Sequence, residues 1–430
     1  MLRGLLRNTI VLCLGLIGLV CVSWLFSAPS KEQRGVWATE GYGLFLDIGR
    51  TVIDVYQVTD VSCHRGMRIP AHLWAVEMLE GATFHIQDAR LKLDVSGTLQ
   101  PIFADRVDSL PDQCGADFAS TDLATNYAVF WHAMAEHYPF FELHGVDWSE
   151  RRAPQGATLW EAITTAMTGL DDGHLYIYDG EDDFSPSQPP DWYEDRHAVR
   201  DATRARVKTG LTRIANAGLE VGLVTDTVAY VYINHMNTDA PLGQANAATA
   251  AKAFEKVLRA YPQAEAYILD VRYNPGGSDD VAMAYADFFA TSPTPAFTKS
   301  TRTRSGYTAP TLIQTEPQTT SVRQPVYVLT SPFTGSAAEI FTLALRELPN
   351  VTTMGTATGG GLSDVLNFTL PNGWELGLSH QIYLAPDGAA YEGVGIPPDI
   401  TVPVDVAAYL RGEDPLIDAA LAHFAQTQQD

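Results

Sequence analysis

Ser336 is the residue of this chain whose surroundings best suit a nucleophile. It stands in Pro332-Phe-Thr-Gly-Ser336-Ala-Ala-Glu339, between a strand-like apolar run at 325–330 and a helix-like run at 337–345. A serine on a glycine turn at a helix start has free N–H groups and the positive end of the helix dipole nearby, and both favour developing negative charge. Ser336-Ala-Ala-Glu339 is also a capping-box pattern. The segment therefore predicts either a nucleophile or a helix cap.

Three further segments of the C-terminal half are rich in glycine. Each has a local explanation as a turn, but glycine also lets the backbone approach a ligand and present bare N–H groups. A serine nucleophile needs such donors, because each donor of an oxyanion hole commonly contributes roughly 10² to 10³ in rate. The segments are Asp270-Val-Arg-Tyr-Asn-Pro-Gly-Gly277, Gly355-Thr-Ala-Thr-Gly-Gly-Gly361 and Glu392-Gly-Val-Gly-Ile-Pro-Pro-Asp399.

Taken together, these segments resemble the serine peptidase family of C-terminal processing peptidases and the tricorn core protease. The first is similar to that family's strand and Gly-Gly turn, and Gly335-Ser336-Ala-Ala-Glu339 resembles its nucleophile motif. Gly355-x-x-Thr358-Gly359 and Gly395-Ile-Pro-Pro-Asp399 follow in the family's order. The resemblance runs from about residue 117 to the C-terminus. It implies an α/β (α+β) peptidase core of ClpP/crotonase-like type, an acyl-enzyme on Ser336, and neither a cofactor nor a metal.

The family activates its serine in two ways. Processing peptidases use a Ser/Lys dyad, with the lysine in the second glycine-rich segment. The matching position here is Gly361, and Lys299 is the last lysine of the chain. There is also no spare stretch for the PDZ domain that this branch inserts before its core. The resemblance therefore favours the tricorn-like branch, which uses a histidine.

His174 is the candidate general base. It ends Leu170-Asp-Asp-Gly-His174, which is similar to the Asp-Gly-His signature of the tricorn-like branch; Tyr138-Pro-Phe and Gly145-Val-Asp-Trp148 also resemble that branch. An arbitrary histidine is more often structural. A neutral imidazole with a pKa of about 6.5 is nevertheless a suitable base for a hydroxyl, and in this context we expect His174 to take the Ser336 proton.

Glu392 is the candidate third residue, since the tricorn-like branch carries an acidic residue just before its Gly-x-Pro-Asp strand. In tricorn a serine next to the histidine bridges it to that glutamate, but here the neighbour is Gly173. Glu392 could therefore orient the imidazole, bind the N-terminus of a substrate, or be a surface charge. Asp171 and Asp172 are competing orienting groups.

The oxyanion hole is expected to consist of backbone N–H groups. Ala337 would supply one of them, and Gly276 or Gly277 the other. His380 and Tyr383 lie in the same C-terminal region, and we expect them to be strand residues that line a cleft at most.

Periodicity indicates which elements place these residues. Apolar residues at helical spacing predict a compact helical bundle over 117–178, and Asp, Ser and Pro at 180–193 predict an exposed loop. Residues 195–430 alternate strands with helices, which predicts parallel βαβ pairing in a peptidase core. The strands are expected at 220–224, 228–233, 266–271, 326–329 and 400–403, and the helices at 247–260, 280–289, behind Ser336 and at 414–424.

The N-terminal part has a different character. Residues 35–116 predict a small β-rich domain, a barrel or a sandwich, with strands at 43–47, 51–56, 83–87 and 91–95. No chemistry is evident in it, and a cell-surface interaction module is one interpretation. Residues 1–30 precede it, where Arg3 and Arg7 are followed by eighteen uncharged, mostly apolar residues at 9–26. This apolar helix predicts a membrane anchor or a cleaved signal peptide.

Cysteine usage and net charge indicate the cellular location and the classes of partner. Cys63 and Cys114 are the only cysteines outside the apolar segment, which suggests a disulfide in an exported protein, with two buried thiols as the alternative. No Cys/His spacing indicates a metal. The formal charge of −23 repels nucleic acid and anionic membrane surfaces. We expect a peptide or protein substrate, no nucleic acid, and a periplasmic or extracellular location.

A binding protein on the same fold is the alternative function. The family has non-catalytic relatives, including retinoid-binding proteins of the eye, and a fold does not determine a function. Retention of Ser336, His174 and the glycine turns favours an exported serine peptidase over a carrier of an apolar ligand or peptide. Hydrogen-bond reach between the Ser336 hydroxyl and the His174 ring would support the enzyme, whereas a blocked histidine would support the binding protein.

Overall fold

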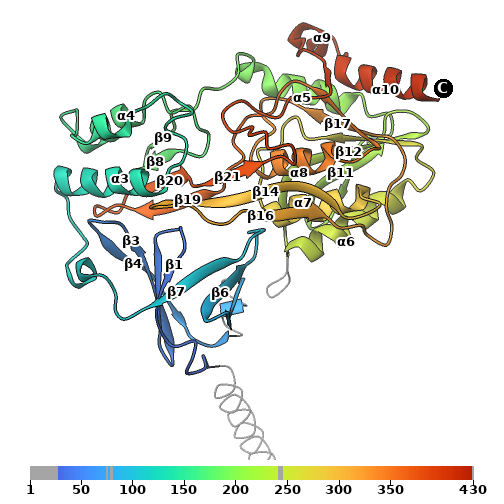
Figure 1. Ribbon diagram of the computed structural model, residues 1–430. Coiled ribbons are helices and arrows are strands. Elements are labelled where there is room, and N and C mark those ends of the chain that lie inside the picture. Colours follow the sequence, from blue (N-terminus) through green and yellow to red (C-terminus); the bar gives the residue numbers. More distant parts are fainter. Residues whose placement is uncertain (1–27, 74–75, 78–80, 241–245, 429–430) are drawn as a thin grey trace, which may run out of the picture. The chain divides into compact units, whose positions relative to one another are not determined.

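The computed structural model describes residues 28–73, 76–77, 81–240 and 246–428 (Figure 1). The predicted apolar helix at 9–26 lies outside these residues, and no helix among those described is long and apolar enough to cross a membrane. Two compact units are formed, the first by the residues up to Val95 with Pro101–Phe118, and the second by Ser96–Gln100 with the rest of the chain from Ala119.

The first unit is an antiparallel sheet of seven strands in the order β4-β3-β2-β1-β7-β6-β5. Trp37, Leu46 and Ile53 belong to its core. The predicted β-rich region is confirmed, but as one open sheet, since its end strands β4 and β5 do not pair in the part described. The sequence does not predict β4, because most of its side chains are exposed. The strands are β1 (Gly35–Thr39), β2 (Leu44–Ile48), β3 (Val52–Val58), β4 (Cys63–Pro70), β5 (Ala82–Gln87), β6 (Arg90–Val95) and β7 (Ile102–Val107).

A disulfide closes a long loop of this unit. It joins Cys63, the first residue of β4, to Cys114 in the 3₁₀ helix η1 (Asp112–Gly115), with the two Cα atoms 4.8 Å apart. The two cysteines are 51 residues apart in the sequence. They are the pair expected from the sequence, and their bond restricts the unfolded chain of this unit.

The second unit contains a seven-stranded sheet in the order β10-β11-β12-β13-β17-β18-β22. The pairs from β12 to β22 are parallel, whereas β10 pairs antiparallel with β11, and β11 pairs antiparallel with β12. Alternation of strands with helices thus gives the parallel pairing that the sequence predicts. The elements are β10 (Thr212–Ile214), β11 (Ala217–Leu223), β12 (Val228–Thr238), β13 (Ala266–Asp270), β17 (Val326–Thr330), β18 (Val351–Gly355), β22 (Ile400–Thr401), α6 (Asn246–Ala260), α7 (Asp279–Ala286) and α8 (Ala337–Arg346).

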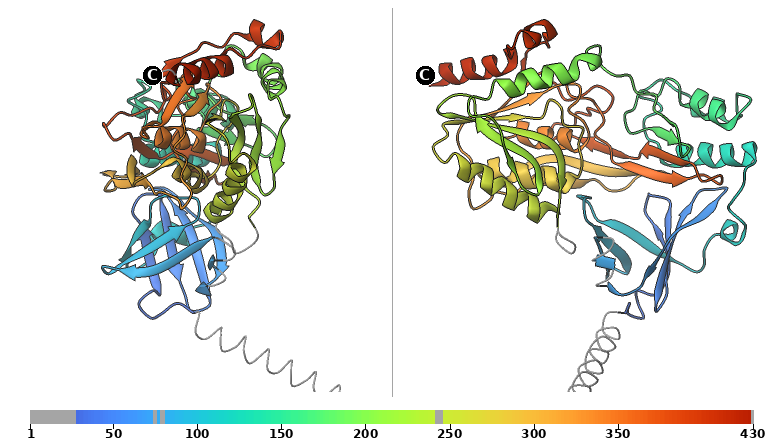
Figure 2. Two further views of the ribbon diagram at one scale, coloured as in Figure 1. Left: turned by 90° about the vertical axis from the view of Figure 1, so that its right-hand side faces the viewer. Right: turned by 180° about the vertical axis from the view of Figure 1, so that it is seen from behind.

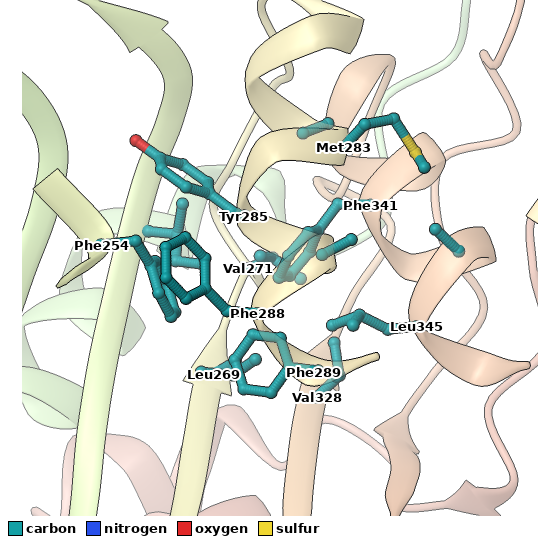
Figure 3. Packing of buried hydrophobic residues seen from close by; sticks show 14 of the residues in the cluster. Phe254, Leu269, Val271, Met283, Tyr285, Phe288, Phe289, Val328, Phe341 and Leu345 are labelled. Carbon is teal, nitrogen blue, oxygen red and sulfur yellow. The ribbon is translucent and has the colours of Figure 1, made fainter. Parts of the chain in front are cut away.

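Helices cover both faces of this sheet. On one face α6, α7 and α8 bring Phe254, Tyr285 and Phe341 together above the strands (Figure 3). On the other face α10 (Pro415–Thr427) packs through Leu416 and Ile417. Figure 2 accordingly shows the red C-terminal helix and the yellow helices on opposite sides of the sheet. Such double coverage is typical of parallel sheets.

The carboxyl ends of the parallel strands carry the segments with predicted chemistry. β13 is followed by residues 275–278, the first glycine loop, and β18 is followed by residues 359–363, the second glycine loop. Between them in the sheet lies β17, which leads to Ser336. Ligand sites of open α/β sheets gather at this edge, so the sheet unites segments that are distant in sequence.

Strand pairing attaches the helical segment to the C-terminal half. The helices α3 (Leu123–His137) and α4 (Leu159–Met167) lie within the predicted bundle and bury Phe130, Met134 and Ile163. The same segment ends in β8 (Tyr176–Tyr178), which pairs with β20 (Glu375–Ser379) in a sheet of the order β19-β20-β8-β9. Residues 170–178 are thereby held against the core.

A further sheet is built around β14 (Thr294–Thr303), which pairs with β15, β16 and β21. The predicted loop at 180–193 contains the short strand β9 and leads into η3. The remaining bounds are β9 (Asp183–Phe184), β15 (Gly306–Tyr307), β16 (Thr311–Thr315), β19 (Val365–Thr369), β21 (Gln381–Leu384), α5 (Arg196–Ala205), α9 (Val406–Leu410), η2 (Trp148–Arg151), η3 (Tyr193–Asp195) and η4 (Asp287–Phe289).

Candidate active site

Ser336 and His174 line the same pocket, which has a volume of about 460 Å³. The first of these residues follows β17 and the second precedes β8, so the pocket lies between the central sheet and the attached helical segment. Glycines of the second glycine loop and Gly393 form part of its lining. The two residues that the sequence pairs as nucleophile and base are therefore brought to one cavity.

Ser336 has an unusual backbone conformation. Its φ of 51° and ψ of −128° lie in a region that residues other than glycine rarely adopt. An ordinary helix N-cap has extended backbone instead. The carboxylate of Glu339 does accept a hydrogen bond from the Ser336 N–H at 3.2 Å, as in a capping box. A cap alone does not require the strained turn, whereas a sharp strand-to-helix turn is a known way to present a nucleophile.

Gly276, in the first glycine loop, lies against this turn. A β-carbon on Gly276 would lie 2.5 Å from the Ser336 β-carbon and 3.0 Å from the Ala337 nitrogen, so only glycine fits. The Gly276 N–H donates to Oδ1 of Asn274 at 2.9 Å. Within the described residues the N–H groups of Gly277 and Ala337 donate to no other group. Of the two glycines expected to serve the oxyanion, Gly277 is thus the one with an available donor.

Glu339 fastens the second glycine loop to the nucleophile turn. Its buried carboxylate accepts from the Thr358 hydroxyl at 2.6 Å and from the N–H groups of Gly360 and Gly361 at 2.7 and 2.8 Å. Burial raises the pKa of Glu339 to about 7 in spite of these hydrogen bonds. Sequence reasoning assigns Glu339 only to the capping box, because its loop partners come from a segment about twenty residues further on.

A hydrogen bond from its backbone N–H fixes the position of His174. The Asp172 carboxylate accepts from the His174 N–H at 2.8 Å and from the Ser379 hydroxyl at 3.1 Å, which ties this turn to the end of β20. Nδ1 of His174 is buried and has no hydrogen-bond partner among the described residues. A β-carbon on Gly361 would lie 3.8 Å from Nδ1 and from Cε1. The imidazole therefore lies against the position that matches the dyad lysine of the processing branch.

Glu392 is buried, so it is not a surface charge. One of its oxygens accepts from the N–H groups of Leu362 and Ser363, both at 3.0 Å, and the other has no partner in the described part of the chain. Burial, followed by the charges of Asp172 and Glu339, raises its pKa well above the usual value. Among the residues that the structure describes, Glu392 and His174 are not joined by a hydrogen bond. Its direct contacts hold the second glycine loop.

The other acidic and aromatic candidates separate into two groups. Asp171 lines the pocket, where its carboxylate accepts from the Gln188 N–H at 3.0 Å. His380 and Tyr383 are buried and do not belong to the pocket lining. Tyr383 packs instead against Lys299, which is fully buried on β14, and Nδ1 of His380 lies 2.9 Å from the main-chain oxygen of Asp364. Nothing in the sequence around Lys299 marks it as part of this region.

One wall of the pocket is apolar. Pro189, Pro190 and Tyr193 come from the predicted loop, and Pro332 and Phe333 come from the turn before Ser336. The loop is pinned there because the rings of Trp192 and Phe333 meet edge to face, with centroids 4.7 Å apart. Lysine and arginine are absent from the described residues that line the pocket. The predicted exposed loop is thus also a wall of the candidate site.

Comparison with known proteins identifies the family. Residues 227–402 match the sequence model of peptidase family S41. This part of the chain is therefore similar to peptidase family S41. The S41 segment contains Ser336, both glycine loops and Glu392, whereas His174 precedes it. The resemblance to C-terminal processing peptidases and tricorn is therefore confirmed at the level of the family.

Individual relatives support the same assignment. A carboxy-terminal-processing protease from Bartonella bacilliformis is 31% identical over 148 residues, which cover 34% of this chain. The alignment spans 33% of that relative, about a third of its length. A crystal structure of a candidate peptidase from Parabacteroides merdae superposes with a TM-score of 0.61 and 25% identity, covering 71% of this chain and 97% of that one.

A more distant structure shares the fold alone. Mature CPAF in complex with lactacystin is 12% identical and gives a TM-score of 0.53, covering 71% of this chain and 98% of that chain. The predicted mixed α/β fold, like that of S41 peptidases and with a β-rich region before it, is therefore confirmed.

Proposed function

We propose that this S41 protein is a serine peptidase that hydrolyses peptide bonds through an acyl-enzyme on Ser336, with His174 as general base. The observation that carries the proposal is that Ser336 and His174 line one pocket, in which the imidazole lies beside Gly361. A histidine in this place supports a tricorn-like Ser/His arrangement over the Ser/Lys dyad. The parallel strands between helices also support a core of ClpP/crotonase-like type.

Acylation is the first half of the proposed reaction. His174 takes the hydroxyl proton of Ser336 as the oxygen attacks the carbonyl carbon of the scissile peptide bond. The oxyanion accepts hydrogen bonds from the N–H groups of Ala337 and of Gly277 in the first glycine loop, and the start of α8 adds its dipole. His174 then gives the proton to the departing amine, which leaves an ester between Ser336 and the acyl part of the substrate.

Deacylation repeats these steps with water. His174 removes a proton from the water as its oxygen attacks the ester carbonyl, and the same N–H groups stabilise the second oxyanion. The proton then returns to Ser336 as the carboxylic acid product leaves. The strained turn at Ser336 and the bonds of Glu339 keep the nucleophile and the second glycine loop in place throughout.

Glu392 is the proposed third residue of the site. Its burial next to Asp172 supports this role, because Asp172 fixes the His174 backbone and the charges of the two acids interact. Asp172 is thus proposed as the residue that sets the position of His174, and Glu392 as the one that orients the site through the second glycine loop.

We also propose that the body of the protein is exported to the periplasmic or extracellular side, with residues 1–30 as its signal or anchor. The disulfide between Cys63 and Cys114 supports this location, because such bonds persist in oxidising compartments. The proposed substrate is a peptide or protein. The apolar wall formed by Pro189, Tyr193 and Phe333 supports a substrate with apolar side chains near the scissile bond.

Digestion of a mixed peptide library by the full chain tests the peptidase assignment, with products identified by mass spectrometry. Ser336→Ala is expected to lower kcat by roughly 10⁴ to 10⁶, and His174→Ala by a similar factor, because both act in one unit. Ser292→Ala, at an exposed turn outside the pocket, is the control. Equal cleavage by wild type and Ser336→Ala would refute the proposal. Binding of apolar peptides without cleavage would favour the carrier function instead.

A further inference from the structure

We propose that Lys299 is a positioning residue of this site, whose buried ammonium group clamps the two glycine loops to each other. The inference rests on the proposed function, because it concerns the geometry of the same site. It assigns a role to the one lysine of the C-terminal half that is buried, although the position of the family's dyad lysine is occupied by Gly361.

Lys299 reaches both loops from β14. Its side chain is fully buried, and Nζ lies 2.6 Å from Oδ2 of Asp364 and 3.4 Å from Oδ2 of Asp279. It also lies 4.9 Å from the ring centroid of Tyr383, which is its cross-strand partner on β21. One ammonium group therefore contacts two carboxylates from different segments.

Asp279 connects Lys299 to the first glycine loop. It is the first residue of α7 and directly follows Ser278, the last residue of the loop, so its carboxylate is anchored two residues after Gly277. The Tyr383 hydroxyl donates to the same carboxylate at 2.8 Å. Fixing Asp279 fixes the end of the loop that brings Gly276 against Ser336.

Asp364 connects Lys299 to the second glycine loop, because it directly follows that loop in the sequence. Its main-chain oxygen lies 2.9 Å from Nδ1 of His380, while the preceding Ser363 hydroxyl accepts from the His380 N–H at 3.0 Å. Glu392 holds the other side of the loop at Leu362 and Ser363. The clamp therefore continues the set of contacts that place Gly361 beside His174.

The energetics favour a positional role over a stabilising one. Burying an ammonium group is costly, and replacing a buried ion pair by apolar residues of similar size is often neutral or stabilising. Burial and the charge of Asp364 raise the pKa of Asp279 to about 7. The Lys299 ammonium, by contrast, holds the pKa of Asp364 below its usual value against the effect of burial. What the charged cluster supplies beyond an apolar core is directional contact with two loops.

The arrangement does not make Lys299 a general base. Its ammonium group is engaged by two carboxylates, one of which has a lowered pKa, and both interactions favour the protonated form. Its effect on catalysis passes through the loops. Oxyanion donors must be held within about 0.5 Å of their productive positions. Loss of the contacts made by Lys299 should therefore lower kcat and leave KM nearly unchanged.

The test compares the full-length wild type with Lys299→Met/Asp364→Asn. The double variant removes the clamp without leaving the Asp364 charge unpaired, and Asp279 keeps the Tyr383 hydrogen bond. Lys208→Met, which breaks the exposed pair with Asp226, is the matched control. The readouts are kcat and KM for a peptide that the wild type cleaves, the thermal midpoint, and hydrogen exchange of the amides at 276–280 and 359–364.

We expect a folded double variant whose kcat falls roughly 10- to 100-fold, with KM within about threefold of the wild type. Amide exchange should accelerate in both glycine loops together and remain unchanged in β11 and β12. A folded variant with wild-type kcat, or with unchanged exchange in both loops, would overturn the clamp. If the wild type shows no Ser336-dependent cleavage, the proposed function fails, and hydrogen exchange alone then decides whether the clamp exists.

Discussion

The His174 ring faces the space that a side chain at Gly361 would enter, since a β-carbon built on the glycine would lie 3.8 Å from Nδ1 and Cε1 of the histidine. A longer side chain at position 361 would project into the space of the imidazole. The processing branch of the family carries its dyad lysine at the position that matches Gly361. The proposed histidine base from the helical segment and a lysine base from the second glycine loop would therefore occupy the same space.

Substitutions at Gly361 test this exclusion. Gly361→Ala should retain kcat/KM within about threefold, because the added methyl group would make ordinary van der Waals contacts at 3.8 Å and more. Gly361→Lys should lower it by at least about 10², since its chain displaces the imidazole from Ser336. Steady-state cleavage of one peptide by both variants is the measurement, and full activity of Gly361→Lys would contradict the arrangement.

Glu339→Gln should reduce activity although it changes the side chain only slightly. Glu339 accepts four hydrogen bonds, from Ser336, Thr358, Gly360 and Gly361, and an amide nitrogen would face two of these donors. Each buried donor left unpaired costs about 1–3 kcal/mol, so we expect a lower thermal midpoint and a kcat reduced roughly 10- to 100-fold. Glu347→Gln, at the end of the same helix, is the control. An unchanged kcat would show that the second glycine loop does not depend on Glu339.

Asp287, in η4, should make the free energy of unfolding depend on pH, because its pKa is raised in the folded protein. Burial raises its pKa to about 6, against hydrogen bonds from Glu316 and Gln318. Between about pH 4 and 6 the folded state keeps a proton that the unfolded state releases. Stability therefore decreases as the pH rises through this window. In Asp287→Asn the fall of the thermal midpoint from pH 4 to 6 should be shallower than in the wild type, while the exposed Asp226→Asn should follow the wild type. Parallel curves for Asp287→Asn and wild type would refute the assignment.

The disulfide should stabilise the first unit specifically. Replacing Cys63 and Cys114 by serine opens a loop of 51 residues, for which the chain-entropy model predicts a loss of about 4 kcal/mol. Differential scanning calorimetry should show a lower transition for the sheet of β1 to β7, and the second unit should unfold as before. A joint shift of both transitions would mean that the two units do not unfold independently.

The elements with strong periodicity were accessible from the sequence. Buried parallel strands such as β13 and β17 are short runs of apolar residues, and α6 and α10 show helical spacing, so their places and types are confirmed. The polar, mostly exposed strand β4 lacks such a pattern. β14 was equally inaccessible, because the burial of Lys299 depends on partners 20 residues before it and 65 residues after it.

The candidate site was predictable where motifs carry it. Ser336, His174 and the glycine loops stand out in the sequence, because special backbone conformations require particular residues such as Gly276. The loop-holding contacts of Glu339 and Glu392 with backbone N–H groups leave no trace in side-chain patterns. The wall formed by Tyr193 and Phe333 depends on ring contacts across segments that are 140 residues apart.

Pairing of β8 with β20 has a consequence for when chemistry becomes possible. The S41 segment at 227–402 supplies the serine, but the proposed base reaches it only after residues 170–178 have docked on β20. Until that contact forms, a chain emerging from synthesis or translocation has a serine without a base. In the proposed mechanism the site is therefore complete only once these two strands have paired.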